Sequence, residues 1–88
     1  DHISDLAQYN IDKVHQIAEK ILDLCTAPRC FEDILQGLFS EYGLRMNFEQ
    51  YVLVGSTARS YLAWLKDRGR LSIDFENNRM LWKRAAQA

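Results

Sequence analysis

The chain has 88 residues and a mass of 10.3 kDa, and 48% of its residues are hydrophobic, which excludes an intrinsically disordered chain. A single domain of this size buries too small a core to enclose an active site, so we expect a domain that binds a partner rather than a complete enzyme. The net charge of −1 weighs against a dedicated nucleic-acid domain, although residues 1–65 carry −4 and residues 66–88 carry +3.

Apolar residues at alternating spacings of four and three predict a long first helix over residues 4–26, with Ser4 as its N-cap. The members of this apolar stripe are Ala7, Ile11, Val14, Ala18, Ile21 and Cys25. Because a three-helix core does not need a helix of this length, we expect its early turns, around Leu6 to Ile11, to project and contact another domain or subunit.

A second helix is predicted over residues 31–41, after the only proline, Pro28. Glu32 and Asp33 lie in its first turn, where the helix dipole favours anions, and Gly43 suits its C-terminal end. Its apolar stripe has no gaps and consists of Phe31, Ile34, Leu35, Leu38, Phe39 and Tyr42.

A third helix is predicted over residues 48–68, with Asn47 as its N-cap and Gly69 at its C-terminal end. Its inner face is expected to consist of Phe48, Tyr51, Gly55, Ala58, Leu62 and Leu65. Gly55 weakens a helix by about 1 kcal/mol relative to alanine, which a close approach of two helices would explain.

The alternation of apolar and polar residues over residues 71–84 predicts a β-hairpin. Asn77 and Asn78 fit the two positive-φ positions of a tight turn, which fixes the register of the strands. The resulting pairs are Phe75 with Met80, Ile73 with Trp82, and Glu76 with Arg79. The first two pairs share one face of the hairpin, and we expect Trp82 to pack the hairpin onto the third helix.

Three helices followed by a two-stranded β-hairpin define a mainly helical α+β fold, the winged helix-turn-helix, in which the hairpin is the wing. The second and third helices form the helix-turn-helix. We expect the connection 43–47 to carry the short extra strand found in many such domains. Residues 1–88 then form a single winged-helix domain, and the start at Asp1 suggests that this domain was excised from a longer chain.

A family resemblance is carried by three runs of sequence: VLVGSTARSYLAWLKDRGRL (52–71), ENNRMLWK (76–83) and YNIDKVHQIAEKILDLC (9–25). In these runs the chain resembles the winged-helix module that lies C-terminal to bacterial metallo-β-lactamase-fold hydrolases. The resemblance implies an accessory domain that makes interdomain or dimer contacts and shapes access to the active site of a metal-dependent parent enzyme. Such hydrolases hold their metals, with zinc as the expected one, on a His-x-His-x-Asp-His motif that this chain lacks. The resemblance therefore implies no catalytic residue, metal ligand or cofactor within this domain.

The outer face of the third helix is the candidate docking surface, and it consists of Leu53, Thr57, Ser60 and Trp64. Direct readout of DNA bases needs long polar or charged side chains, whereas an exposed leucine and tryptophan on one helical face are typical of a protein contact. We therefore expect this face to dock on the hydrolase domain of the same chain or on a second subunit. No membrane partner is expected.

The alternative function is that of a DNA-binding transcriptional regulator, which reads the major groove with its third helix and contacts phosphates with its wing. The residues available for nucleic-acid contact are Gln50, Arg59, Arg68, Arg70, Arg79, Lys83 and Arg84. Asp67, Asp74 and Glu76 dilute this basic patch, so a solvated hairpin that protects its edge strand explains the cations better. A third hypothesis is a basic wing that contacts RNA or a single strand on behalf of a nuclease-like hydrolase.

The two cysteines indicate neither a disulfide scaffold nor a zinc site. Four residues separate Cys25 from Cys30, whereas zinc pairs more often follow C-x₂-C and a structural site needs four ligands. We expect both thiols to be buried and inert, which fits a cytoplasmic protein with reduced cysteines. The sequence shows no membrane-spanning run and no signal-peptide pattern. Ser56, Ser60 and Ser72 have no histidine nearby in the sequence, so no nucleophilic triad is predicted.

Overall fold

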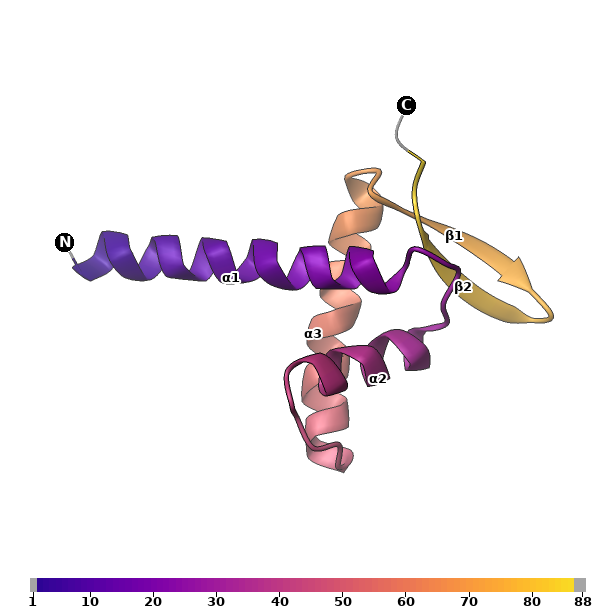
Figure 1. Cartoon of the computed structure of the whole chain (residues 1–88), viewed down its shortest axis with the longest axis horizontal. Helices are drawn as coiled ribbons and strands as arrows, with labels where there is room; N and C mark the ends of the chain where they lie inside the picture. Colours follow the sequence, from indigo (N-terminus) through magenta and orange to yellow (C-terminus); the bar gives the residue numbers. More distant parts are fainter. Residues whose placement is uncertain (1, 87–88) are drawn as a thin grey trace.

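The computed structural model describes the backbone of residues 2–86 and the side chains of residues 12–86. Three helices are followed by a two-stranded antiparallel sheet (Figure 1), which confirms the predicted mainly helical α+β class and its winged-helix-like layout. The elements are α1 (His2–Leu24), α2 (Phe31–Glu41), α3 (Phe48–Asp67), β1 (Leu71–Glu76) and β2 (Arg79–Arg84).

Helix α1 begins at His2 and ends at Leu24, so both ends of the first helix lie two residues earlier than predicted. Ser4 lies inside the helix and is not its N-cap. At the other end, Pro28 disfavours helical backbone in the residue before it. The last turn closes where the Cys25 N–H donates to the carbonyl oxygen of Ile21 at 3.1 Å, and the chain then turns toward α2.

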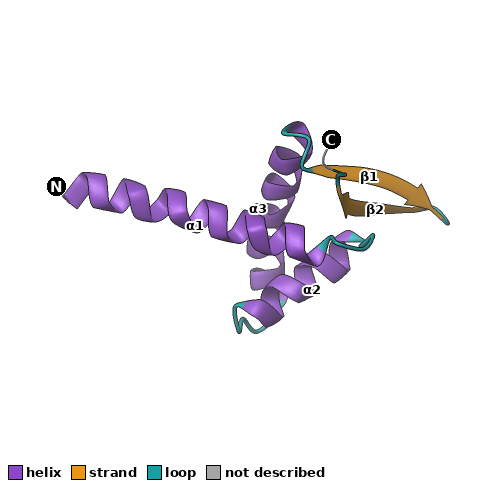
Figure 2. Ribbon diagram, turned by 45° about the horizontal axis from the view of Figure 1, so that its top comes forward, coloured by secondary structure: helices purple, strands orange, loops and turns teal. Residues whose placement is uncertain are grey.

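The core lies where the C-terminal part of α1 meets α2 and α3, and Figure 2 shows α1 crossing α3 with α2 beside it. The buried side chains are Ala18, Ile21, Leu22 and Cys25 of α1, Ile34, Leu35, Leu38 and Phe39 of α2, Ala58, Leu62 and Leu65 of α3, and Leu71 and Trp82 of the hairpin. The N-terminal half of α1 extends away from this core in both views, as expected for its early turns. Their contact with another domain or subunit stays a prediction.

Glycine ends α2 and α3 in the same way, as predicted. Gly43 has a φ of 62°, and the N–H of the next residue, Leu44, donates to the carbonyl oxygen of Phe39 at 2.8 Å. Gly69 has a φ of 75° and is followed by the same bond pattern at the end of α3. Both helix ends therefore satisfy carbonyl groups that have no partner within the helix.

The hairpin has the predicted register. The confirmed pairs are Phe75 with Met80, Ile73 with Trp82, and Glu76 with Arg79. Asn77 and Asn78 both have positive φ, at 55° and 61°, as the tight turn requires. Trp82 is buried, as expected of a core residue. Its strand β2 packs mainly against α2, however, and it is β1 that packs against α3.

The strand-like pairing outside the hairpin comes from a different connection than predicted. Residues 44–47 form no strand, whereas the connection between α1 and α2 pairs with β2 at Arg29. The Arg29 N–H donates to the carbonyl oxygen of Trp82 at 2.9 Å, and the Trp82 N–H donates back at 2.7 Å. The connection 43–47 cannot take this place because it completes the end of α2 and leads to the end of α3 away from the hairpin (Figure 1).

Candidate docking surface

The inner face of α3 holds the helix to the core. Gly55, Ala58, Leu62 and Leu65 are buried, as predicted. Tyr51, one turn before Gly55, is half-buried, and its hydroxyl donates to the carboxylate of Glu32 on α2. This hydrogen bond is the main cause that raises the pKa of Tyr51, and it fastens the start of α3 to α2.

The predicted place of Phe48 on this inner face is wrong, because 80% of its surface is exposed. Phe48 is the first residue of α3, and the helix starts there because the side chain of Asn47 accepts the N–H of Gln50 at 2.8 Å. The buried part of α3 begins only at Gly55. Periodicity gives the angle of Phe48 around the helix axis, but it does not give the point along the axis where the core ends.

Phe48 joins a group of exposed apolar side chains at the start of α3, which we call the α3 apolar surface. Its members are Leu44, Met46, Phe48, Val52 and Leu53. Two of them come from the connection after α2 and three from the first two turns of α3. Figure 1 shows that this end of α3 lies away from the hairpin. Large exposed apolar residues concentrated in one short stretch of the chain make that stretch a candidate contact surface.

Of the four predicted docking residues, only Leu53 belongs to this surface. Thr57 and Ser60 are exposed, but their hydroxyls donate to carbonyl oxygens of their own helix, at 3.1 and 3.3 Å. Trp64 is half-buried and packs against the core, and the guanidinium of Arg68 lies 4.6 Å from the centroid of its ring. The expected exposure of Trp64 is therefore wrong, and the apolar part of the outer face is shifted to the first turns of α3.

Several candidate nucleic-acid residues are engaged inside the domain. The guanidinium of Arg59 lies 4.0 Å from the centroid of the Phe31 ring, and that of Arg70 lies 3.3 Å from the carboxylate of Glu19. With Arg68 on Trp64 and Arg79 on the side chain of Cys30, four of the predicted cations therefore already have partners on the domain itself. The remaining members are Gln50 and Arg84, which are half-buried, and Lys83, which is exposed.

The two cysteines have different environments. Cys25 is fully buried, and burial raises the pKa of its thiol to about 11, although the nearby Arg29 opposes this shift. Cys30 is half-buried rather than buried as predicted, and a hydrogen bond with its side chain is the main cause that raises the pKa of Arg79. Among the described residues, no group of three or more His, Cys, Asp or Glu side chains could hold a metal ion.

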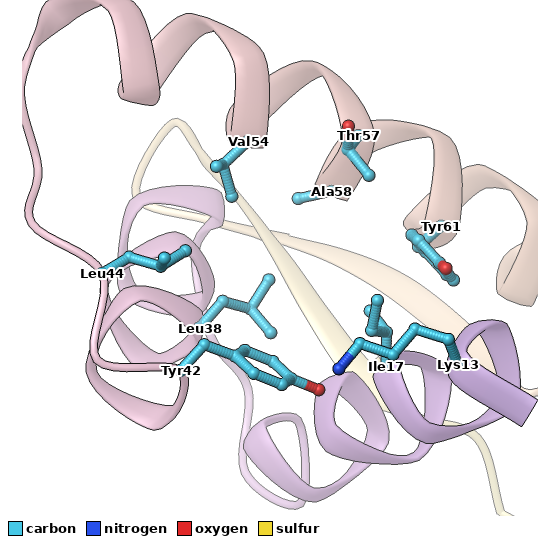
Figure 3. A pocket seen from close by; sticks show the side chains of 9 residues that line it. All are labelled: Lys13, Ile17, Leu38, Tyr42, Leu44, Val54, Thr57, Ala58 and Tyr61. Atoms are coloured by element: carbon cyan, nitrogen blue, oxygen red, sulfur yellow. The ribbon is translucent and has the colours of Figure 1, made fainter. Parts of the chain in front are cut away.

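A groove between the three helices is a second apolar feature, which the sequence did not predict (Figure 3). It has a volume of about 270 Å³, and its apolar walls include Ile17, Leu38, Tyr42, Leu44, Val54 and Tyr61. The only signal in the sequence was that some of these residues flank the predicted inner faces. At its edge the ammonium of Lys13 lies 5.1 Å from the centroid of the Tyr42 ring, and Figure 3 shows the two side chains pointing toward each other.

Comparisons of the chain with protein-family models, with curated proteins and with solved structures found no match. In the part of the chain that the structure describes, no helix is both long enough and apolar enough to cross a bilayer. The resemblance to the winged-helix module of metallo-β-lactamase-fold hydrolases therefore stays a prediction.

Proposed function

We propose that this chain is a non-catalytic winged-helix accessory domain that docks on a neighbouring protein domain through the α3 apolar surface. The observation that carries the proposal is the exposure of Phe48, Val52 and Leu53 on the first two turns of α3. In a winged helix that reads DNA, these turns would face the major groove, where polar side chains contact base edges. Here three large apolar side chains occupy them.

The energetics of burial favour a protein contact at this surface. Removing a leucine or phenylalanine side chain from water contributes about 1.5–3 kcal/mol, and aromatic anchors near the centre of an interface contribute most. Phosphates and base edges offer little apolar surface in return. Phe48 and Leu53, which are 80% and 64% exposed, therefore fit a protein partner with apolar pockets.

The polar groups farther along α3 support the same interpretation. The hydroxyls of Thr57 and Ser60 are bonded to carbonyl oxygens of their own helix. Arg59 and Arg68 lie over aromatic rings of the domain. Each of these groups would have to leave a partner before it could contact a base or a phosphate.

We assign the partner to a metallo-β-lactamase-fold hydrolase domain of the same parent protein, on the basis of the sequence resemblance. In such a protein the reaction and its zinc ions belong to the hydrolase domain. The residues of the α3 apolar surface have no titratable group, which suits them to packing. Their role would be to hold this domain against the hydrolase and so to shape access to its active site.

Hydrogen exchange of the backbone amides tests this proposal on the 88-residue chain and on the complete product of its gene. We expect the amides of residues 44–53 to exchange at least about tenfold more slowly in the complete protein, because docking removes the start of α3 from solvent. Leu53→Ser in the complete protein should abolish this added protection, whereas the matched control Lys83→Ser should keep it. Equal exchange of residues 44–53 in the two proteins would overturn the proposal.

DNA binding is the alternative function, and it depends on different residues. It requires Gln50, Arg59 and the cations of the wing to matter, with an affinity that falls steeply as salt increases. Docking on a protein requires Phe48 and Leu53 to matter, with little dependence on salt because the contact is apolar.

A further inference from the structure

The groove between the three helices has apolar walls and one polar end. Leu38, Leu44 and Val54 line its apolar part. At the polar end, Figure 3 shows the side chains of Lys13 on α1 and Tyr42 at the end of α2 pointing toward each other, with the Lys13 ammonium 5.1 Å from the centroid of the Tyr42 ring. A groove divided in this way suits a ligand that has an apolar body and one charged group.

The hydroxyl of Tyr42 is a hydrogen-bond donor that has no acceptor. It is buried, and it has no hydrogen-bond partner among the described residues. Burial is the main cause that raises the pKa of Tyr61 on α3, and the nearby Tyr42 adds to it, so a second phenol lies close to the first. Buried hydroxyls are normally bonded, because an unmet one costs free energy. The unmet hydroxyl therefore points to an acceptor that comes from outside the domain.

The charge of Lys13 favours an anion as this acceptor. Its side chain is exposed and lies over the Tyr42 ring, and the long stem of a lysine can turn without any movement of the backbone. Glu41, which precedes Tyr42, is already paired with Lys20 at 2.8 Å. When the Lys13 ammonium turns toward an incoming carboxylate, it leaves the ring, and the Tyr42 hydroxyl can donate to the second carboxylate oxygen.

The volume of the groove sets the size of the apolar body. About 270 Å³ is the liquid volume of roughly nine water molecules, which corresponds to a ligand of on the order of ten non-hydrogen atoms. We propose that the groove binds a small carboxylic acid with an apolar chain or ring, with its carboxylate on Lys13 and Tyr42 and its apolar body against Leu44 and Val54. The inference does not rest on the proposed function, because this site shares only Leu44 with the α3 apolar surface.

An NMR titration of the isotope-labelled 88-residue chain with octanoate, which has the required size, tests the proposal. We expect a dissociation constant on the order of 10⁻⁴ M, because the ligand is small and the groove is open on one side. The largest amide shifts should fall in residues 13–17, 38–44 and 54–61. Octylamine has the same chain with a positive charge, and acetate has the carboxylate without the chain. Both controls should bind at least about tenfold more weakly than octanoate.

Two variants test the polar groups separately. Tyr42→Phe should weaken octanoate binding at least about tenfold, because it removes a hydrogen bond to a charged group. It should not lower the stability of the free domain, because the hydroxyl has no partner among the described residues. Lys13→Gln should weaken binding about threefold, since an exposed ion pair contributes less. Lys66→Gln is the matched control, because it removes the same charge on α3 outside the groove, and it should leave the affinity unchanged.

The proposal fails if octanoate causes no shifts up to about 10 mM, if octylamine binds as tightly as octanoate, or if either Tyr42→Phe or Lys13→Gln leaves the affinity unchanged. Shifts confined to residues 46–53 would place octanoate on the α3 apolar surface, and they would overturn the proposal as well. None of these results bears on protein docking through that surface, so the two proposals are tested separately.

Discussion

The two halves of α3 have similar apolar content but different surroundings. In the C-terminal half, Ala58, Leu62 and Leu65 are buried against the other helices and the hairpin. In the N-terminal half, Phe48 and Leu53 face solvent. The difference shows that the chain buries the apolar residues of only one half of this helix.

The boundary between the halves is set by the elements that cover α3. Helix α2 reaches the start of α3 through the hydrogen bond of the Tyr51 hydroxyl to Glu32, and this bond holds the inner side only. The outer side of the same turns carries Val52 and Leu53 and receives no cover from the hairpin, which lies at the other end (Figure 1). The buried half therefore stabilises the fold, while the exposed half is available to a partner.

The largest expected effect is on the free energy of unfolding, at Trp82 of the hairpin, which closes the core. Trp82→Ala should lower the free energy of unfolding by about 3–5 kcal/mol, because it removes a large buried side chain. Urea denaturation measures the loss, with Phe75→Ala as a control on the exposed part of the same hairpin face. A loss below about 1 kcal/mol at Trp82 would show that the hairpin is not part of the core.

Two leucines on α3 give the sharpest form of the comparison. Leu62→Ala should cost about 2–5 kcal/mol of unfolding free energy, because Leu62 has no exposed surface. Leu53→Ala, the same change nine positions earlier, should stay within about 0.5 kcal/mol because Leu53 is exposed. Chemical denaturation of both variants measures the difference. Similar losses of unfolding free energy at the two positions would contradict the difference between the halves of α3.

The buried thiol of Cys25 predicts a loss of stability at high pH. Its pKa rises from an ordinary 9.0 to about 11 in the folded chain, so the protonated thiol contributes stability that is fully present below about pH 9. This contribution, about 2–3 kcal/mol, is lost as the pH rises toward about 11, because the unfolded chain ionises first. Urea denaturation at pH 8 and at pH 11 measures it. Cys25→Ala should remove this part of the pH dependence, and an unchanged dependence in the variant would contradict the assignment.

The smallest expected effect is at Gly55, the first buried residue of α3. A methyl group added there would lie 3.8 Å from Leu35 and from Phe31, which is ordinary van der Waals contact, so the expected close approach of two helices does not require glycine. Gly55→Ala should therefore raise the free energy of unfolding by up to about 1 kcal/mol. Thermal denaturation measures the gain, and a loss would show that α2 and α3 lie closer together than 3.8 Å allows.

Local signals in the sequence predicted the parts of the fold that local geometry determines. The bounds of α2, the register of the hairpin and the turn at Asn77 and Asn78 follow from spacing and turn chemistry within a few residues. The N-cap at Asn47 follows from the same kind of signal.

The errors concern contacts between distant segments. Phe48 has the angle of a core residue but lies beyond the end of the core. The pairing of β2 with Arg29 depends on where Pro28 directs the chain, and no alternation at Arg29 predicts it. The groove is formed by three helices together, so no single stretch of sequence encodes it. The outer face of α3 was predicted as the docking surface, but its apolar part is shifted from Trp64 toward Phe48.

A titration of the 88-residue chain with mixed-sequence duplex DNA, followed by fluorescence anisotropy at low and at moderate salt, distinguishes a protein-docking α3 from a DNA-reading one. We expect no binding tighter than about 10⁻⁶ M at moderate salt, because the first turns of α3 present Phe48, Val52 and Leu53 where a reading helix needs polar groups. Tighter binding with a steep dependence on salt, lost in Arg59→Ala and kept in Leu53→Ser, would contradict it and make α3 a nucleic-acid reader.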